Sequence, residues 1–314
     1  MEGSMEKMRL ALIAGGKSSE REVSLKSGAQ VYEALDKSKY DIRRYDPLTD
    51  LGRLAQDAPE IQVALIIMHG RGGEDGTMQG FLELLEIPYQ GSGVLASALA
   101  MDKPLSKALY QMAGLKVPTT LAFGRAQALK PKEIEGALGL PVVIKPATEG
   151  SSIGVTLART LKELEEGLIR AFRCDSQLLV EEYIKGTEVT GAVLGNRNAQ
   201  SLPLVEIIPS GSYTFFDYEA KYQPGASTEI CPARLNPELT AKAQRSALKA
   251  HHVLGCRGYS RTDMIVRDDQ VYVLETNTIP GMTATSLFPQ AARAAGLEFP
   301  ALLDELIRLA LEKE

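Results

Sequence analysis

Cysteine and histidine are scarce in this sequence. The three cysteines, Cys174, Cys231 and Cys256, are odd in number and far apart, which is typical of reduced thiols rather than of a disulfide framework. The chain has only three histidines and no Cys-x-x-Cys spacing, and this argues against a zinc site. A metal ion would therefore be held by oxygen ligands, which points to magnesium.

Long apolar runs and an excess of charge of one sign are also lacking. The longest apolar runs, such as VALIIM at 63–68, are too short to span a bilayer, and the N-terminal MEGSMEKMRL lacks the apolar core of a signal peptide. The net charge is −5, and the basic residues are scattered along the chain. We therefore expect a cytoplasmic protein that binds neither nucleic acid nor a membrane.

The composition is that of an ordinary globular protein, and the length predicts several domains. Apolar residues make up 44% and charged residues 24% of 314 residues, which corresponds to two or three domains. Residues 8 to about 100 alternate between strand and helix patterns, which predicts a Rossmann-like parallel sheet with helices on both faces. The strands are expected at 8–16, 40–46 and 61–68, with a strand and loop at 87–93, and the helices at 23–35, 76–86 and 94–101.

The remainder of the chain predicts two further units of α+β type. We place the domains at 1–101 (N-terminal α/β), 102–187 (central) and 188–314 (C-terminal). In the central unit a helix at 104–115 is followed by strands at 119–123, 140–145 and 176–184 and one clear long helix at 162–172. The C-terminal unit shows strands near 188–194, 203–208, 259–266 and 271–277, a helix from Asn236-Pro237 to Leu254, and two final helices. Between them, 209–233 reads as a long irregular stretch with five aromatic residues.

The end of the last strand, LETNTIPGMTATSL, holds the densest group of candidate site residues. Glu275 and Asn277 are two apart in a strand, so they share a face, with Val271 and Val273 behind them. A three-residue hairpin loop at DDQ would set Asp263 opposite Glu275 and Arg261 opposite Asn277, whereas an even loop would separate the two carboxylates. Facing carboxylates favour a bound cation, and two Mg²⁺ ions would clamp a transferring phosphoryl group. An ordinary solvated strand face is the alternative.

Beyond that strand, Pro280-Gly281 predicts a turn, and Thr285 or Ser286 can cap a helix that runs to about Ala295. The free N–H groups at such a helix start bind an anion, although a simple cap is the default interpretation.

Glycine loops follow three of the expected strands. IKPATEGSSIG at 144–154 combines Lys145 with small residues able to wrap phosphate oxygens, but it lacks the ending of a P-loop and can equally be a flexible surface turn. AGGKSSEREVS at 14–24 lacks GxGxxG, which argues against NAD, and its Glu20 is placed to meet an ammonium group. In MHGRGGEDGT at 68–77, His69 is either a core histidine or a site residue. Lys103 supplies a second positive charge near the phosphate loop.

These segments together resemble one family. GGKSSEREVS, HGRGGEDGTMQG, AMDK, KPATEGSS, YEAKY, GYSRTD and ETNTIPGMTATSL occur in this order, and the chain resembles the D-alanine–D-alanine ligases of the ATP-grasp superfamily over nearly its whole length after Met8. The resemblance implies three domains with ATP held between the second and third sheets. It also implies Mg²⁺ (two ions, with Mn²⁺ as a substitute), a homodimer, two D-alanine substrates and a place in peptidoglycan precursor synthesis.

The resemblance also assigns roles to individual residues. The Mg²⁺ ligands are Asp263, Glu275 and Asn277. The ATP contacts are Lys103, Lys145, Ser152, the hinge of Glu181, Glu182, Tyr183 and Ile184, and Glu188 for the ribose. Substrate and catalytic residues are Glu20, His69, Ser151, Lys221, Tyr222, Arg261, Gly281, Ser286 and Leu287. Tyrosine at position 222 accompanies dipeptide rather than ester formation in the family, which implies D-alanyl-D-alanine as the product.

Three alternatives remain open at this stage. The first is an ATP-grasp ligase that joins a different amino or hydroxy acid. The second is a nucleotide-binding regulator without turnover. The third, an NAD-dependent enzyme, is disfavoured by the missing GxGxxG.

Overall fold

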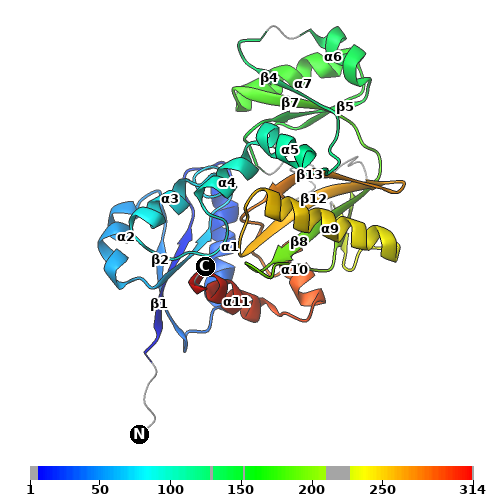
Figure 1. The fold of residues 1–314 in the computed structure, drawn as a ribbon. Coiled ribbons are helices and arrows are strands. Elements are labelled where there is room, and N and C mark those ends of the chain that lie inside the picture. Colours follow the sequence, from blue (N-terminus) through cyan, green and yellow to red (C-terminus); the bar gives the residue numbers. More distant parts are fainter. Residues whose placement is uncertain (1–5, 128–129, 151–152, 210–226, 313–314) are drawn as a thin grey trace.

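The computed structural model describes residues 6–127, 130–150, 153–209 and 227–312, and these residues form three β-sheets (Figure 1). The first sheet is parallel, as the alternating pattern predicts, with strand order β2-β1-β3. Its strands are β1 (Met8–Ala14), β2 (Tyr40–Tyr45) and β3 (Val63–Ile67). Every residue of β3 is buried, because a parallel strand covered on both faces meets no water.

The helices of the N-terminal region partly match the sequence prediction. They are α1 (Arg21–Ala34), α2 (Leu51–Asp57), the short 3₁₀ helix η1 (Ala58–Glu60), α3 (Thr77–Leu84) and α4 (Val94–Met101). The helix α2 was not expected. The strand expected at 87–93 is reduced to one isolated bridge between Tyr89 and Ala64, because Pro88 and the glycines that follow do not extend the ladder.

The second sheet is antiparallel, with strand order β4-β7-β5-β6. Thr160 begins the helix α7 with a capping box, in which its side chain accepts from the backbone N–H of Glu163. The helix α6 was not expected, since only one long helix was clear in this unit. The elements are α5 (Lys103–Met112), β4 (Thr120–Gly124), α6 (Pro131–Leu138), β5 (Val142–Pro146), β6 (Thr156–Ala158), α7 (Leu161–Cys174) and β7 (Gln177–Glu182).

The third sheet has strand order β11-β10-β8-β12-β13, with β9 paired to β8. The strand β11 lies within the stretch 209–233 that the sequence predicts to be irregular, so that prediction is wrong for Ser227–Ile230. Asn236 caps α9 through the backbone N–H of Leu239, as expected. The elements are β8 (Thr187–Leu194), β9 (Gln200–Ser201), β10 (Val205–Pro209), β11 (Ser227–Ile230), α9 (Pro237–Val253), β12 (Tyr259–Arg267), β13 (Gln270–Asn277), α10 (Leu287–Ala294) and α11 (Phe299–Leu311).

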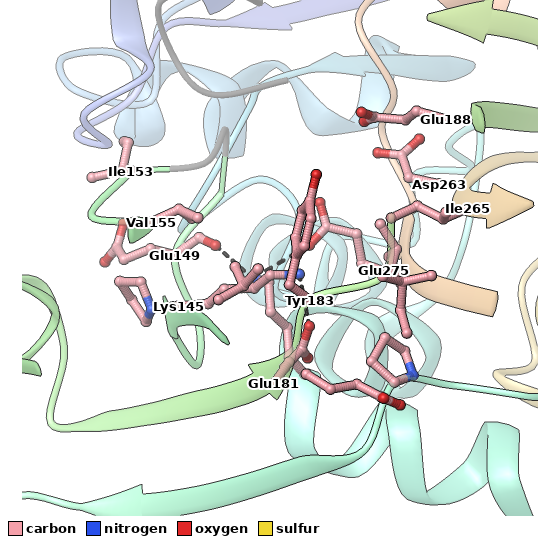
Figure 2. A pocket seen from close by; sticks show the side chains of 17 residues that line it. Lys145, Glu149, Ile153, Val155, Glu181, Tyr183, Glu188, Asp263, Ile265 and Glu275 are labelled. Atoms are coloured by element: carbon pink, nitrogen blue, oxygen red, sulfur yellow. Dashed lines mark hydrogen bonds and ion pairs between the residues drawn. The ribbon is translucent and has the colours of Figure 1, made fainter. Parts of the chain in front are cut away.

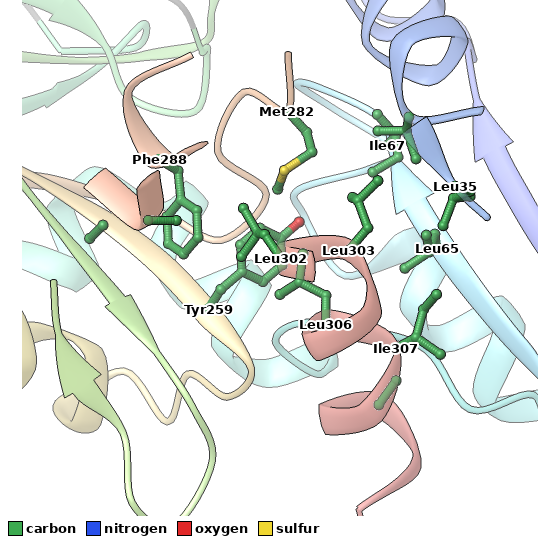
Figure 3. Close-up of a cluster of buried hydrophobic side chains, with 14 of the residues drawn as sticks. Leu35, Leu65, Ile67, Tyr259, Met282, Phe288, Leu302, Leu303, Leu306 and Ile307 are labelled. Carbon is green, nitrogen blue, oxygen red and sulfur yellow. The ribbon is translucent and has the colours of Figure 1, made fainter. Parts of the chain in front are cut away.

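The largest buried apolar cluster joins the first sheet to the C-terminal region (Figure 3). The helix α11 places Leu303 and Ile307 against a cluster that also contains Leu65 of β3. In the same cluster Tyr259 meets Phe288 edge to face at 5.4 Å. Apart from Thr187 at the start of β8, each sheet takes its strands from one of the three domain ranges predicted above, but the last helix of the C-terminal range packs on the N-terminal sheet.

None of the described helices is long and apolar enough to cross a membrane.

Candidate active site

The hairpin of β12 and β13 brings the predicted metal ligands together. Asp263 pairs with Glu275 and Arg261 pairs with Asn277, which is the register expected from the sequence. The connection is different, because Arg267 pairs with Gln270 and the turn has two residues instead of three. A one-residue β-bulge at Leu274 restores the register that a two-residue turn alone would have broken.

The bulge also corrects the expectation that Val271 and Val273 lie behind Glu275 on one face. Val273 pairs with Met264, and both side chains belong to the apolar core beneath α9. Glu275 pairs with Asp263, and both line an open cleft on the other side of the sheet. Directly opposed residues of two paired strands point to the same face of the sheet. The unpaired Leu274 therefore lets Val273 face the core while Glu275, two residues later, faces the cleft.

Asp263 is buried and already has protein partners. Arg261 donates to both carboxylate oxygens, from Nε and Nη2, each at 2.8 Å. Thr190 donates to Oδ1 at 2.7 Å, and the amide of Asn277 lies 3.4 Å from Oδ2. A carboxylate has about four acceptor positions, so these four contacts fill them, and the long contact from Asn277 is the one that a metal ion would displace most easily.

The oxygen-rich donor set fits a Mg²⁺ ion. Asp263 and Glu275 supply two carboxylates and Asn277 an amide, and Mg²⁺ commonly takes one or two carboxylates and completes its shell with water and phosphate oxygens. Among the described residues no group of three or more His, Cys, Asp or Glu side chains is placed to hold a metal ion. The set at this hairpin contains only two acids, so it depends on oxygens from a nucleotide to be complete.

A cleft lies between the second and third sheets (Figure 2). Apolar side chains form much of its lining, and charged side chains from both sheets project into it, which is the composition that a nucleotide requires. The lining residues used below are Lys103, Lys145, Glu149, Glu181, Glu182, Tyr183, Ile184, Glu188, Asp263, Leu274 and Glu275.

The predicted adenine hinge lies along the edge of this cleft. The carboxylate of Glu182 accepts from the backbone N–H of Thr119 at 2.8 Å and from its hydroxyl at 3.0 Å, which fixes the hinge to the start of β4. Ile184 is buried, and Tyr183 projects into the cleft (Figure 2). Glu188 in β8 lines the cleft as well, close to Asp263 in the view.

The two predicted phosphate-binding lysines reach the same cleft from different elements. Lys103, at the start of α5, donates to the carbonyl of Glu149 at 2.6 Å and lies 3.9 Å from Glu275 Oε2. Lys145, in β5, lies 3.0 Å from Glu181 Oε2. Burial would lower the pKa of Lys145, but the charges of Glu181 and Glu275 outweigh it and raise the pKa, so the ammonium group is charged.

The glycine loop at 148–154 is fastened to the N-terminal region by one arginine. Arg71 donates to the hydroxyl of Thr148 at 2.6 Å and lies 3.2 Å from Glu149 Oε1 and 3.7 Å from Asp175 Oδ2. Asp175 also accepts from the backbone N–H and the hydroxyl of Thr148, both at 2.8 Å. The loop over the cleft is therefore tied to two domains.

Glu20 lies where two glycine loops meet. It is buried just before α1, and a Cβ added to Gly70 or to Gly150 would come within 2.7 or 2.6 Å of its Oε2 atom. Only glycine allows the backbone of both loops to approach the carboxylate this closely. The geometry suits recognition of a small cation such as a substrate ammonium.

His69 has a protein partner at each ring nitrogen. Nδ1 lies 3.3 Å from the carbonyl oxygen of Ile279, which can only accept, so Nδ1 carries the proton. Nε2 then accepts from the hydroxyl of Ser27 at 3.2 Å. Burial lowers the pKa of His69 to about 4, so the ring is neutral at pH 7. These contacts support the core-histidine alternative, and its contact with substrate stays a prediction.

Ser286 begins α10 as the sequence predicts, and the helix ends at Ala294. Its hydroxyl accepts from the backbone N–H of Thr283 at 3.1 Å and lies 2.7 Å from the Thr283 hydroxyl. A Cβ on Gly281 would come within 3.0 Å of this hydroxyl, so the Pro-Gly turn packs closely on the helix start. Leu287 is buried as the first helical residue.

Two charged residues of this region were missed by the sequence analysis. Glu74 is buried, and its carboxylate accepts from the backbone N–H of Gly70 at 2.7 Å. Burial and the charge of Glu20 raise the pKa of Glu74 to about 8. Lys107 is buried 2.8 Å from Glu181 Oε1, and its spacing of four residues from Lys103 on α5 was the available signal.

Four predicted site residues lie outside the described residues: Ser151, Ser152, Lys221 and Tyr222.

Comparisons with known proteins agree with this arrangement. The family model for the D-ala D-ala ligase C-terminus matches residues 109–308, and the model for the N-terminus matches 9–50 and 44–92. A D-alanine–D-alanine ligase of Syntrophobacter fumaroxidans is 60% identical over 309 residues, which cover 98% of this chain and 99% of that protein. The chain belongs to the D-alanine–D-alanine ligase family.

Solved structures of ligases in this family share the whole fold. The D-alanine–D-alanine ligase from Bacillus anthracis complexed with ATP is 36% identical, with a TM-score of 0.84 and 97% of each chain covered. The VanG D-Ala:D-Ser ligase from Enterococcus faecalis is 33% identical, with a TM-score of 0.84, 98% of this chain and 100% of that chain covered. Both agree with the expected ATP-grasp fold, and membership of a ligase family sets aside the NAD-dependent alternative.

Proposed function

We propose that this protein joins two D-alanine molecules into D-alanyl-D-alanine with hydrolysis of ATP to ADP and phosphate, for peptidoglycan precursor synthesis. The observation that carries the proposal is the pairing of Asp263 with Glu275 at the edge of a cleft that Lys103 and Lys145 also line. Two carboxylates and two ammonium groups in one cleft provide sites both for a divalent cation and for a triphosphate.

In this proposal ATP occupies the cleft between the second and third sheets. The hinge from Glu181 to Ile184 contacts adenine, Glu188 holds the ribose, and Lys103 and Lys145 bind phosphate oxygens together with Ser152. The side chain of Glu182 is already engaged by Thr119, so this residue contributes through its backbone.

Asp263, Glu275 and Asn277 would hold two Mg²⁺ ions, for which Mn²⁺ can substitute. The metal supplies charge neutralisation on the transferring phosphoryl group when it is bound. Arg261 orients the Asp263 carboxylate, because it donates to both oxygens.

The first D-alanine would be held through its ammonium group by Glu20, linked through Ser151 to Lys221 and Tyr222 of the long loop, with His69 nearby. Its carboxylate is placed toward the phosphates and becomes an acyl phosphate. The second D-alanine would bind through its carboxylate at Ser286 and Leu287, since the N-terminal end of a helix such as α10 favours a bound anion.

The second substrate's neutral amine then attacks the acyl carbon, and the tetrahedral intermediate collapses to the amide with loss of inorganic phosphate and a proton from the amine. Arg261 has five N–H groups and uses two of them on Asp263, which leaves donors at Nη1. In this proposal these donors and the backbone N–H of Gly281 meet the developing oxyanion. One such donor typically contributes about 3 kcal/mol to transition-state stabilisation. Acyl phosphates hydrolyse, so the loops 148–154 and 209–228 are proposed to exclude water.

The proposal extends to assembly and location. We expect a homodimer in the cytoplasm that binds neither nucleic acid nor membrane. Large apolar side chains are exposed on two neighbouring helices, Leu84 on α3 and Val94 and Leu95 on α4, and these suit contact with a second copy. If Leu84→Glu leaves the sedimentation coefficient of a dimer unchanged, this face is not the contact.

A second candidate is a ligase that joins D-alanine to a different partner, because the structure of a D-Ala:D-Ser ligase matches the chain over 98% of its length. The deciding experiment supplies ATP, Mg²⁺ and D-alanine alone, and then with D-serine or D-lactate, and follows phosphate release with product mass. D-Alanyl-D-alanine as the dominant product supports the proposal, and a mixed product formed in preference supports the second candidate. Absence of phosphate release under all conditions would reject both and favour a regulator.

A further inference from the structure

A buried lysine lies behind the nucleotide cleft and has no role in the function proposed above. Lys107 is on α5, its side chain is only 4% exposed, and it lies outside the set of described residues that line the cleft. Its Nζ is 2.8 Å from Glu181 Oε1, close but not aligned as in a hydrogen bond. The other carboxylate oxygen of Glu181 lies 3.0 Å from Lys145 Nζ, so two ammonium groups share one carboxylate.

The charge states of Glu181, Lys107 and Lys145 depend on one another, because the three side chains are largely shielded from water. Burial would raise the pKa of Glu181, but the charges of Lys107 and Lys145 outweigh it and lower the pKa. Burial lowers the pKa of Lys107, and the charge of Glu181 opposes this effect. Glu181 is therefore ionised, and its charge raises the pKa of both lysines against the effect of burial.

This arrangement creates a conflict for Lys145. The side chain is proposed to bind the phosphate chain of ATP, yet in the structure it is held by Glu181 (Figure 2). If Lys145 were the sole partner of Glu181, its movement to a phosphate would leave a buried carboxylate without compensation. Breaking a buried ion pair in this way is strongly unfavourable.

We infer that Lys107 is a positioning residue that keeps Glu181 neutralised, so that Lys145 can turn from Glu181 to the nucleotide phosphates. Lys107 does not touch the nucleotide and acts only through Glu181. The inference rests on the proposed nucleotide site and adds to it the residue that makes Lys145 available.

The test compares binding of two probes, ADP and adenosine, to the full chain by isothermal titration calorimetry at fixed Mg²⁺. Adenosine lacks the phosphates, so the ratio of the two dissociation constants isolates the phosphate contacts. In Lys107→Met, we expect Glu181 to retain Lys145, and the preference for ADP over adenosine to fall by about 10- to 100-fold, the worth of one charge-assisted hydrogen bond. Adenosine affinity should change by no more than about twofold.

A second variant distinguishes this mechanism from loss of packing. In Lys107→Met combined with Glu181→Gln, no carboxylate holds Lys145, so the preference for ADP should return to within about threefold of wild type. An unchanged preference in Lys107→Met, or an equal loss in the double variant, would overturn the inference. Lys162→Met, at an exposed side chain of α7, is the matched lysine control.

The two variants also protect the test against misfolding. If Lys107→Met does not fold, the double variant decides, because no carboxylate restrains its Lys145 and its preference for ADP should again lie within about threefold of wild type; a larger loss overturns the inference. Failure of the underlying nucleotide site is separate, since the wild-type protein would then not prefer ADP to adenosine at all.

Discussion

Asp263 lies opposite Glu275 because Leu274 is an extra residue in β13. The two-residue turn at Asp268 and Asp269 would by itself place the two carboxylates on opposite faces of the sheet. The bulge moves Glu275 to the cleft face, and Leu274 lines the cleft beside it. Because of this one inserted residue, Val273 packs in the apolar core beneath α9, whereas Glu275 points into the cleft on the other side of the sheet.

The metal assignment predicts a specific defect in Asp263→Asn. The amide keeps the shape of the side chain but removes the charge that a divalent cation requires, so the Mg²⁺ concentration at half-maximal activity should rise about 10- to 100-fold. Mg²⁺ titrations of dipeptide formation measure this shift. Asp268→Asn is the matched control, because it changes an aspartate at the tip of the same hairpin, in a left-handed conformation that asparagine also tolerates. Wild-type Mg²⁺ dependence in Asp263→Asn would exclude this carboxylate as a ligand.

The site for the second substrate predicts a selective effect of Ser286→Ala. The hydroxyl contacts both the backbone and the side chain of Thr283 at the start of α10, so its loss should disorder the proposed carboxylate site. Since the loss of a hydrogen bond of this kind costs about 1 kcal/mol, the KM for the second D-alanine should rise about fivefold, while the KM for ATP stays unchanged. Thr285→Ala serves as the neighbouring control. Equal changes in both KM values would indicate a general loss of structure.

The contacts between Arg71 and the glycine loop predict that, in Arg71→Met, phosphate release becomes partly uncoupled from dipeptide formation. Without the contacts to Thr148 and Glu149, the loop should open more often and admit water to the acyl phosphate. Parallel assays of phosphate and dipeptide should then give more than one phosphate for each dipeptide formed. Arg170→Met, at an exposed position on α7, should leave the ratio at that of wild type. A ratio that stays at one in Arg71→Met would show that the loop closes without this arginine.

Glu74 predicts a stability that depends on pH. Its pKa is raised from 4.5 to about 8 by burial and by the charge of Glu20, with Glu275 acting in the same direction and Arg261 opposing. Between these pH values the folded protein retains a proton that the unfolded chain releases, so the free energy of unfolding falls as pH rises from about 4.5 to 8.

The variant Glu74→Gln should remove that contribution. Glutamine still accepts from Gly70 but does not titrate, so the variant should gain stability relative to wild type as pH rises, by at most about 1.4 kcal/mol for each pH unit. Urea unfolding at pH 5, 6.5 and 8 measures the difference. Glu86→Gln, at an exposed position, provides the control. A difference between Glu74→Gln and wild type that does not change with pH would show that Glu74 is ionised throughout.

The sequence predicted the strands of the hairpin and the residues at their ends, because β-forming runs and polar ends are local signals. It did not predict how the register is achieved, since nothing in VYVLETN marks Leu274 as the extra residue. The correct pairing was therefore expected for an incorrect reason, a three-residue loop.

Residues whose environment depends on distant parts of the chain were the hardest to predict. In the sequence Lys107 is an ordinary helix lysine, and only the fold shows that it lies beside Glu181. Likewise Glu74 is an ordinary loop carboxylate in the sequence, and only the fold shows that it is buried near the charge of Glu20. The short helices α2 and α6 were missed because each buries a single side chain, Leu54 or Ile134, and so carries little apolar periodicity. The family motifs supplied the site roles that no local pattern could assign.

The packing of α11 on β3 has a consequence for how the molecule forms. The helix α11, residues 299–311, covers part of the first sheet although it lies far from β3 in the sequence, so the strands of this sheet stay partly uncovered until α11 has been made and has packed on them. Removing this helix would expose Leu65 and its neighbours and weaken the sheet that carries Glu20 and His69. The first sheet and α11 therefore form one folding unit.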